Sequence, residues 1–170
     1  MCIDITLNNL NFDKIHDASA TLALCWKAAY KGLVNDEYLS SLKRTHWVEF
    51  LVKSIHSKST KCIVAEKDNM IVGISIFGNS KTKKYPDDGE IISLYVVPEF
   101  IGQNIGHMLL ERAQQGIAQQ NYQNCITCTL AENVRAIRFY KSHGYEIVSQ
   151  DEIVKMGAEE MSYVIMRKVL

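Results

Sequence analysis

Apolar and polar positions along the chain change their spacing several times, and each change predicts a new element. Residues 2–7 alternate, with Ile3, Ile5 and Leu7 on one side, which predicts a first β-strand. Residues 13–30 then carry an apolar side chain at every third or fourth position. This spacing predicts an amphipathic helix.

Two shorter helices are predicted before the main sheet begins. One covers residues 36–42 and the other residues 46–57. Asn35 and Thr45 stand directly before these segments, and both residue types accept hydrogen bonds from the first amides of a helix. We therefore expect both to act as N-caps.

The second half of the chain alternates strands and helices. Asp68 and Asn69 separate two β-branched runs, which predicts a hairpin. A strand over residues 90–97 stops at Pro98 and leads into a helix over residues 105–119. The remaining predictions are strands at residues 61–67, 70–78, 124–130, 145–150 and 161–170 and a helix at residues 133–144. This order predicts an α+β fold, a mixed sheet covered by helices.

Length and charge narrow the class of protein. A chain of 170 residues is expected to form a single domain over residues 1–170. Its formal net charge is zero and its basic residues are dispersed, so we expect no nucleic-acid partner. No long apolar run or targeting segment is visible, so we expect no membrane partner and a cytoplasmic protein.

The five cysteines do not have the spacing of a disulfide framework or a metal site. Cys125 and Cys128 form a Cys-x-x-Cys pair, but they lie in a predicted strand, where residues three apart point to opposite faces. No second pair completes a metal shell. We expect buried structural cysteines and no metal.

Three segments together resemble the GNAT superfamily of acyl-CoA-dependent N-acyltransferases. The first, "VVPEFIGQNIGHMLL", is similar to the family's strand, Gly-rich loop and helix, but departs from it at Ile101 and Asn104. The second, "ENVRAIRFYKSHGYEIV", matches a family motif through Asn133, Tyr140 and Gly144, among others. The third, "CWKAAYKGLVNDEYLSSL", resembles the helical arm that many small bacterial members place beside the acceptor.

The resemblance implies a fold, an activity and a donor. The fold would be a mostly antiparallel sheet of about six or seven strands, whose central strands splay apart to hold acetyl-CoA. The activity would be transfer of an acetyl group to a primary amine within a ternary complex. The implied cofactor contacts are Leu94, Tyr95, Val96, Gly102, Gln103, Asn104, Ile105, Gly106, His107, Asn133 and Tyr140.

The loop before the third long helix has chemistry that suits a phosphate even without a cationic side chain. A helix N-terminus presents unpaired amides and a partial positive charge. Gly106 allows a close approach, and Asn104 tolerates a left-handed turn. His107 either donates to a phosphate or is simply solvated. Further candidate contacts for a 3'-phosphate are Lys81, Lys83, Lys84 and Arg112.

Tyr140 and Glu90 are the candidate catalytic residues. A phenol beside the departing thiolate can protonate it, although Tyr140 could also be an ordinary core aromatic. Many family members place a catalytic glutamate where Glu90 stands, and on a regular strand it shares a face with Leu94 and Val96. The alternative for Glu90 is a solvated residue at the start of a strand.

The identity of the acceptor amine is the feature that the sequence specifies least. Trp26, Tyr30 and Glu37 are candidate substrate contacts, together with Asp36, Tyr38, Asp87 and Asp88. Their acidic and aromatic character would suit a cationic amine, but core packing of the aromatic residues and solvation of the acidic ones are the favoured interpretation, because charged residues in loops usually face water. A small-molecule amine is the expected acceptor. Alternatives are a protein or peptide amine and a non-catalytic acyl-CoA sensor, and a homodimer is possible for this family.

Overall fold

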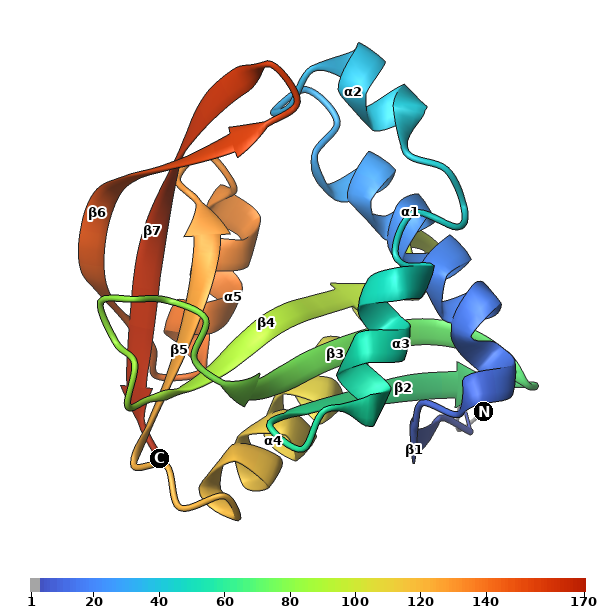
Figure 1. The fold of residues 1–170 in the computed structure, drawn as a ribbon, viewed down its shortest axis with the longest axis horizontal. Coiled ribbons are helices and arrows are strands. Elements are labelled where there is room, and N and C mark those ends of the chain that lie inside the picture. Colours follow the sequence, from blue (N-terminus) through green and yellow to red (C-terminus); the bar gives the residue numbers. More distant parts are fainter. Residues whose placement is uncertain (1–3) are drawn as a thin grey trace.

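The computed structural model describes residues 4–170 as a seven-stranded sheet with helices on both faces (Figure 1). The strand order is β1-β2-β3-β4-β5-β7-β6. The strands are β1 (Thr6–Asn9), β2 (Thr60–Lys67), β3 (Met70–Asn79), β4 (Gly89–Val96), β5 (Asn124–Leu130), β6 (Glu146–Met156) and β7 (Glu159–Val169). The α-helices are α1 (Ile15–Ala29), α2 (Asp36–Ser41), α3 (Val48–His56), α4 (Ile105–Ala118) and α5 (Val134–Ser142), with short 3-10 turns η1 (Phe12–Lys14) and η2 (Pro98–Phe100).

The predicted order of strands and helices is confirmed, and so are several of its local signals. Asp68 and Asn69 both have positive φ and turn β2 into β3. The side chain of Asn35 accepts hydrogen bonds from two amides at the start of α2. Tyr30 ends α1, and Gly32 follows it with a φ of 77°.

Three predicted boundaries are wrong. Thr45 does not cap α3, because the chain makes one more turn and the helix begins at Val48 without a side-chain cap. The first strand begins at Thr6, and the predicted positions 2 and 3 lie outside the described residues. Strands β6 and β7 run on into a long hairpin whose turn at Gly157 lies against Tyr38 of α2.

Two apolar layers hold the helices to the sheet. On one face, α4 packs Leu109, Leu110 and Ile117 against the sheet with no exposed surface. On the other face, α1 and α3 bury Leu22 and Leu51 (Figure 1). No helix of residues 4–170 is long and apolar enough to cross a membrane.

Strands β4 and β5 are parallel neighbours for only three residues. Their pairing runs from Gly89–Cys125 to Ile91–Thr127 and then stops. The Thr127 hydroxyl donates to the Ile91 carbonyl at 3.1 Å, which secures the last pair. Beyond it, β4 stays with β3 and β5 stays with β7, so the two strands diverge (Figure 1).

A β-bulge lies in β4 at the point of divergence. Residue Ile91 pairs with Phe77 and Ser93 pairs with Ile76, which leaves Ile92 as the extra residue. Because of this extra residue, Leu94 packs on the α4 face, as Ile91 does, although the two are three positions apart. The face that a β4 side chain occupies therefore cannot be read from simple alternation.

Gly73 on β3 allows α4 to lie close to the sheet. A Cβ atom at this position would stand 2.9 Å from Leu109 Cδ1 and 3.1 Å from Ile105 Cγ2. Both neighbours belong to the first two turns of α4, so Gly73 sets how near the start of this helix approaches β4.

We predict that Gly73→Ala lowers the free energy of unfolding by about 1–3 kcal/mol, because the added methyl group overpacks a filled interface. Ser75→Ala is the matched control, two residues further on the same strand. Its buried hydroxyl has no partner in the described residues, so its removal should be neutral or stabilising. Urea unfolding of both variants tests this, and equal destabilisation would contradict it.

Candidate active site

A cleft of about 880 Å³ opens between the diverging strands. Its walls come from β4, β5, the loop after β4, the first turn of α4, the length of α5 and the C-terminal end of α1. Most of the predicted cofactor contacts meet here: Leu94, Tyr95, Val96, Gly102, Asn104, Gly106, His107, Asn133 and Tyr140 all line it. The cleft is therefore built from segments far apart in the sequence.

The loop into α4 has the conformation of an anion-binding turn. Gly102 and Asn104 both have positive φ, at 85° and 65°. The turn presents the amides of Ile105, Gly106 and His107, which begin the helix and so have no intrahelical acceptor. A Cβ on Gly106 would stand 3.4 Å from Phe139, an ordinary van der Waals contact, so packing against α5 does not itself require glycine here.

Two predicted contacts in this loop do not present side chains to the cleft. Ile105 is buried in the core, so only its backbone remains available. Gln103 is absent from the cleft lining, and its side-chain amide donates to the Glu99 carbonyl at 3.1 Å. Its buried Oε1 atom has no partner in the described residues. Any role of these residues rests on the main chain.

The backbone of β4 faces the open side of the cleft at alternate residues. The Val97 amide donates to the Val72 carbonyl, so Val97 belongs to a hydrogen-bonded pair with β3. In an antiparallel ladder these pairs alternate, so Tyr95 also bonds β3, whereas Leu94 and Val96 turn their amides and carbonyls towards β5. Backbone pairing of Leu94 and Val96 with a ligand stays a prediction. For Tyr95 it is wrong, because only its side chain is free.

Tyr140 lies at the bottom of the cleft on α5 and is 6% exposed. Burial raises the pKa of its phenol above the ordinary value, and a hydrogen bond with Thr127 opposes this shift in part. The hydroxyl is therefore protonated across the neutral pH range, which is the state a proton donor needs.

Asn133 positions the helix that carries Tyr140. Its Oδ1 accepts a hydrogen bond from the Ala136 amide at 3.1 Å and so caps α5. The residue also lines the cleft. Since the oxygen is committed to the cap, only the Nδ2 group remains to meet a ligand.

Glu90 is buried at the start of β4. The alternative, that it is a solvated residue at the start of a strand, is therefore wrong. Its Oε2 accepts from the Lys81 amide at 2.6 Å and from the hydroxyls of Ser80 and Thr82. The prediction that Glu90 shares a face with Leu94 and Val96 is wrong, because the bulge at Ile92 intervenes. Glu90 instead shares the α1 side with Ile92 and Tyr95, and it does not itself line the cleft.

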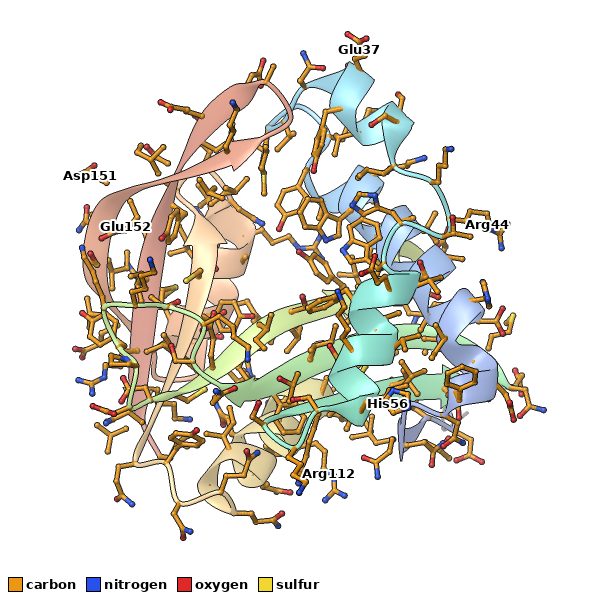
Figure 2. The ribbon with its side chains drawn as sticks, in the orientation of Figure 1. Glu37, Arg44, His56, Arg112, Asp151 and Glu152 are labelled. Carbon is orange, nitrogen blue, oxygen red and sulfur yellow. The ribbon has the colours of Figure 1, made fainter. Side chains whose placement is uncertain are left out.

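The predicted substrate residues separate into three different positions. The Tyr30 hydroxyl lies 2.8 Å from the Tyr95 hydroxyl at the cleft wall. Trp26 is behind this wall, where its ring packs edge-on against Tyr30 and at a tilt against Trp47 and Tyr95. Glu37 is exposed at the outer end of α2 and points away from the cleft (Figure 2). The structure therefore contradicts a direct substrate contact for Glu37 and gives Trp26 a packing role.

The charged residues proposed for a 3'-phosphate are also elsewhere. Lys84 pairs with Glu152 on β6, and Lys81 bonds Asn79. Both lysines belong to the connection between β3 and β4, which enters β4 at the end opposite the α4 loop. Arg112 projects from the outer side of α4 (Figure 2). Lys83 shares the connection with Lys84, and none of these four side chains lines the cleft.

The acidic candidates before β4 have structural positions as well. Asp88 is buried, binds the Arg167 side chain at 2.7 and 3.0 Å and accepts from Asn124, whereas Asp87 is exposed. Asp36 is exposed, and Tyr38 packs against the β6–β7 turn. In the described residues, no aspartate or glutamate lines the cleft.

Sequence reasoning missed several residues that the structure brings to the cleft. Lys31 and Arg135 are its only lysine and arginine in the described residues, and His143 and Phe139 form part of its wall. Phe139 was a matched position of the motif over residues 132–148, but Arg135 and His143 of the same segment were not singled out, nor was Lys31 of the segment 25–42. Arg135, Phe139 and His143 are four residues apart on α5, which was the available signal that they share a face.

Cys128 also lines the cleft, which contradicts its expected burial. Cys25, Cys62 and Cys125 are buried as predicted. Cys125 lies against Tyr145 on the α4 side and Cys128 against Thr82 on the other, so the two do point to opposite faces. Desolvation raises the pKa of the Cys128 thiol to about 11, so it is a poor nucleophile at neutral pH.

Comparison with known proteins gives a consistent picture. Residues 58–147 match the family model of the acetyltransferase (GNAT) domain. An uncharacterized N-acetyltransferase of Archaeoglobus fulgidus is 33% identical over 123 residues, which cover 67% of this chain and 77% of that protein. Spermidine N(1)-acetyltransferase of Thermoplasma acidophilum is 22% identical over 154 residues, covering 88% and 92%.

A solved structure is similar over almost the whole chain. It is the PaiA N-acetyltransferase of Thermoplasma acidophilum in complex with coenzyme A, with a TM-score of 0.78 and 20% identity. The alignment covers 98% of this chain and 99% of that one.

We predict that alkylation of Cys128 by iodoacetamide rises about tenfold per pH unit from pH 7 to 10, because the thiolate fraction grows at this rate below the pKa. Peptide mass spectrometry in a Cys2→Ser background would measure the rate. An ordinary exposed thiol would instead level off near pH 8.5 to 9. Such a plateau would contradict the desolvated state of this cysteine.

Proposed function

Because the chain belongs to the GNAT family of N-acetyltransferases, we propose that it transfers an acetyl group directly to the primary amine of a small molecule. Membership of this family makes it an acyltransferase with acetyl-CoA as the donor. The class of acceptor and the roles of individual residues are the proposed part. The arrangement that supports them is one cleft in which an open strand edge, a helix N-terminus and a protonated tyrosine meet.

The residues of the cleft fit the donor. The outward amides and carbonyls of Leu94 and Val96 suit a pantetheine arm, which carries amide groups of its own. The amides of Ile105, Gly106 and His107 suit the diphosphate.

Chemistry at the acetyl group is divided among three groups of the chain. When bound, acetyl-CoA supplies a thioester whose carbonyl carbon the amine attacks. The amide of Val96 would donate to the thioester oxygen as negative charge grows there, which leaves the Val96 carbonyl and the backbone of Leu94 for the pantetheine arm. Tyr140 Oη holds a proton that it can give to the departing sulfur.

Glu90 is proposed to take the proton that the amine must lose. A lysine-like amine is neutral in only about one molecule in 2,500 at pH 7, a handicap of roughly 4.6 kcal/mol. The three donors to Glu90 all bind Oε2, so Oε1 has no protein hydrogen bond among the described residues. Because Glu90 lies behind the cleft wall, it would act through water.

The walls of the cleft favour a monoamine over a polyamine. No carboxylate lines it in the described residues, and its free charged side chains are basic. A second ammonium group would therefore find no ion-pair partner there. The acceptor end offers aromatic and small side chains instead, from Tyr30, Tyr95, Ala28 and Ala29.

The cellular setting is also proposed from chemistry. Four thiols of the described residues are free, which suits the reducing cytoplasm where acetyl-CoA is available.

Calorimetric titration with acetyl-CoA, followed by thiol-release assays over monoamines, polyamines, amino acids and peptides, tests the proposed function. Binding with thiol release for a small monoamine is the expected result. Release only with peptides would make a protein amine the acceptor, and binding without release for any amine would favour a sensor.

Tyr140→Phe should lower kcat by about 10²- to 10⁴-fold with little change in acetyl-CoA affinity, because only the proton donor is removed. Tyr145→Phe is the matched control. Its hydroxyl bonds Cys125 and Gln114 in the core and does not line the cleft, so this variant should lose stability but keep kcat. Steady-state kinetics at saturating amine separates the two. Equal kcat for Tyr140→Phe and the wild type would contradict the assignment.

Glu90→Gln should lower kcat/KM for the amine by about 100-fold at pH 7, and the deficit should shrink as pH approaches the pKa of the amine. The reason is that a base is needed only while the amine is protonated. The glutamine oxygen can still accept from Lys81, Ser80 and Thr82, so folding should survive. A deficit that stays constant from pH 7 to 10 would indicate a purely structural role.

A further inference from the structure

Two histidines form a hydrogen-bonded pair at the start of α4. The distance from His107 Nδ1 to His143 Nε2 is 2.9 Å, and both residues line the cleft. His107 belongs to the first turn of α4, whereas His143 ends α5. The pair therefore joins the two helices that bound the phosphate end of the cleft.

The hydrogen bonds of the pair determine where its protons lie. His143 Nδ1 is 2.7 Å from the Phe139 carbonyl, and a carbonyl oxygen can only accept, so this nitrogen carries a hydrogen. In the neutral form His143 Nε2 is then an acceptor. His107 must donate to it through Nδ1, which leaves a lone pair on His107 Nε2.

A neutral pair is consequently a poor partner for a phosphate. A single histidine could turn an N–H group towards an anion without gaining charge, but pairing removes that choice. One added proton changes this, because whichever ring carries it, His107 Nε2 then holds a hydrogen. The protonated pair is both a donor and a cation.

Cations are scarce around this point. Residues 98–104 contain no lysine or arginine, and Ile101 stands where the family resemblance implies glutamine or arginine. The charged group that faces His107 is Glu111, one turn along α4 with Oε2 3.6 Å from Nε2. Arg135, in the first turn of α5, lines the cleft two turns away from His143. Glu111 is exposed, so water screens its charge. From β4 the neighbouring side chain is Val96, which does not titrate.

We propose that His107 and His143 form a proton-linked phosphate site, in which His143 holds His107 so that it binds the diphosphate of acetyl-CoA only after the pair gains a proton. This inference rests on the proposed donor. His107 is the binding residue and His143 is a positioning residue. Donor binding is thereby coupled to proton uptake, so the affinity for the donor rises as pH falls.

Proton uptake measured by calorimetry tests the coupling. We would titrate the full-length protein with coenzyme A at pH 6.5 in buffers of different ionisation enthalpy. The wild type should take up about 0.3 to 0.5 more protons than His107→Lys, whose charge is fixed. The ligand's own ionisation cancels in this difference. Coenzyme A affinity of the wild type should fall about tenfold from pH 6 to 8, against a flatter profile for His107→Lys.

The His143→Phe variant distinguishes a positioning role of His143 from a packing role. It keeps an aromatic ring beside Phe139 but removes the acceptor, so His107 can choose its tautomer freely. This variant should bind coenzyme A more weakly than the wild type at pH 6, at least as well at pH 8, and with less proton uptake. If His143 only packed against its neighbours, the variant would bind coenzyme A more weakly by the same factor at pH 6 and at pH 8.

The outcomes distinguish this inference from the proposed function. Equal proton uptake by the wild type and His107→Lys would overturn the inference and leave the donor assignment intact. Failure of the folded wild type to bind coenzyme A at any pH would overturn both.

Discussion

The short pairing between β4 and β5 is the constraint on which the site depends. Three residue pairs hold these strands together, and the bond from Thr127 to the Ile91 carbonyl marks where they separate. Past this point the backbone groups of Leu94 and Val96 have no strand to meet. Buried main-chain amides and carbonyls require partners, so the gap is a place for water or for a ligand with amide groups. The cleft is thus a consequence of an interrupted sheet.

The surrounding elements keep the gap between β4 and β5 open and supply the groups that line it. Core packing of α4 on Gly73 brings an N-terminus to the end of β4, and the cap at Asn133 brings α5 to the opposite wall. The bulge at Ile92 then separates the faces of β4, so that Glu90 and Tyr95 lie on the α1 side and Leu94 and Val96 on the α4 side. Under the proposed function, the donor-binding groups and the base therefore lie on different sides of one strand.

Under the proposed function, anion binding relies on backbone dipoles more than on fixed cations. The first turn of α4 supplies unpaired amides, and the side chain of His107 on this turn already bonds His143 of α5. Such a site is expected to bind an anion more weakly than one with an arginine in the loop, because a helix N-terminus carries only a partial charge.

Local signals in the sequence were sufficient for the elements and for the family. The turn at Asp68 and Asn69, the cap at Asn35 and the motif through Asn133 and Tyr140 depend on neighbours within a few residues, so they could be interpreted from the chain alone. What only the tertiary structure decided was which side chains face the cleft. The bulge moved Glu90 to the other face, the turn of α2 sent Glu37 outward, and packing of α4 against α5 joined His107 to His143. Each of these outcomes depends on contacts between segments distant in sequence. Hydrophobic periodicity carries no information about such contacts.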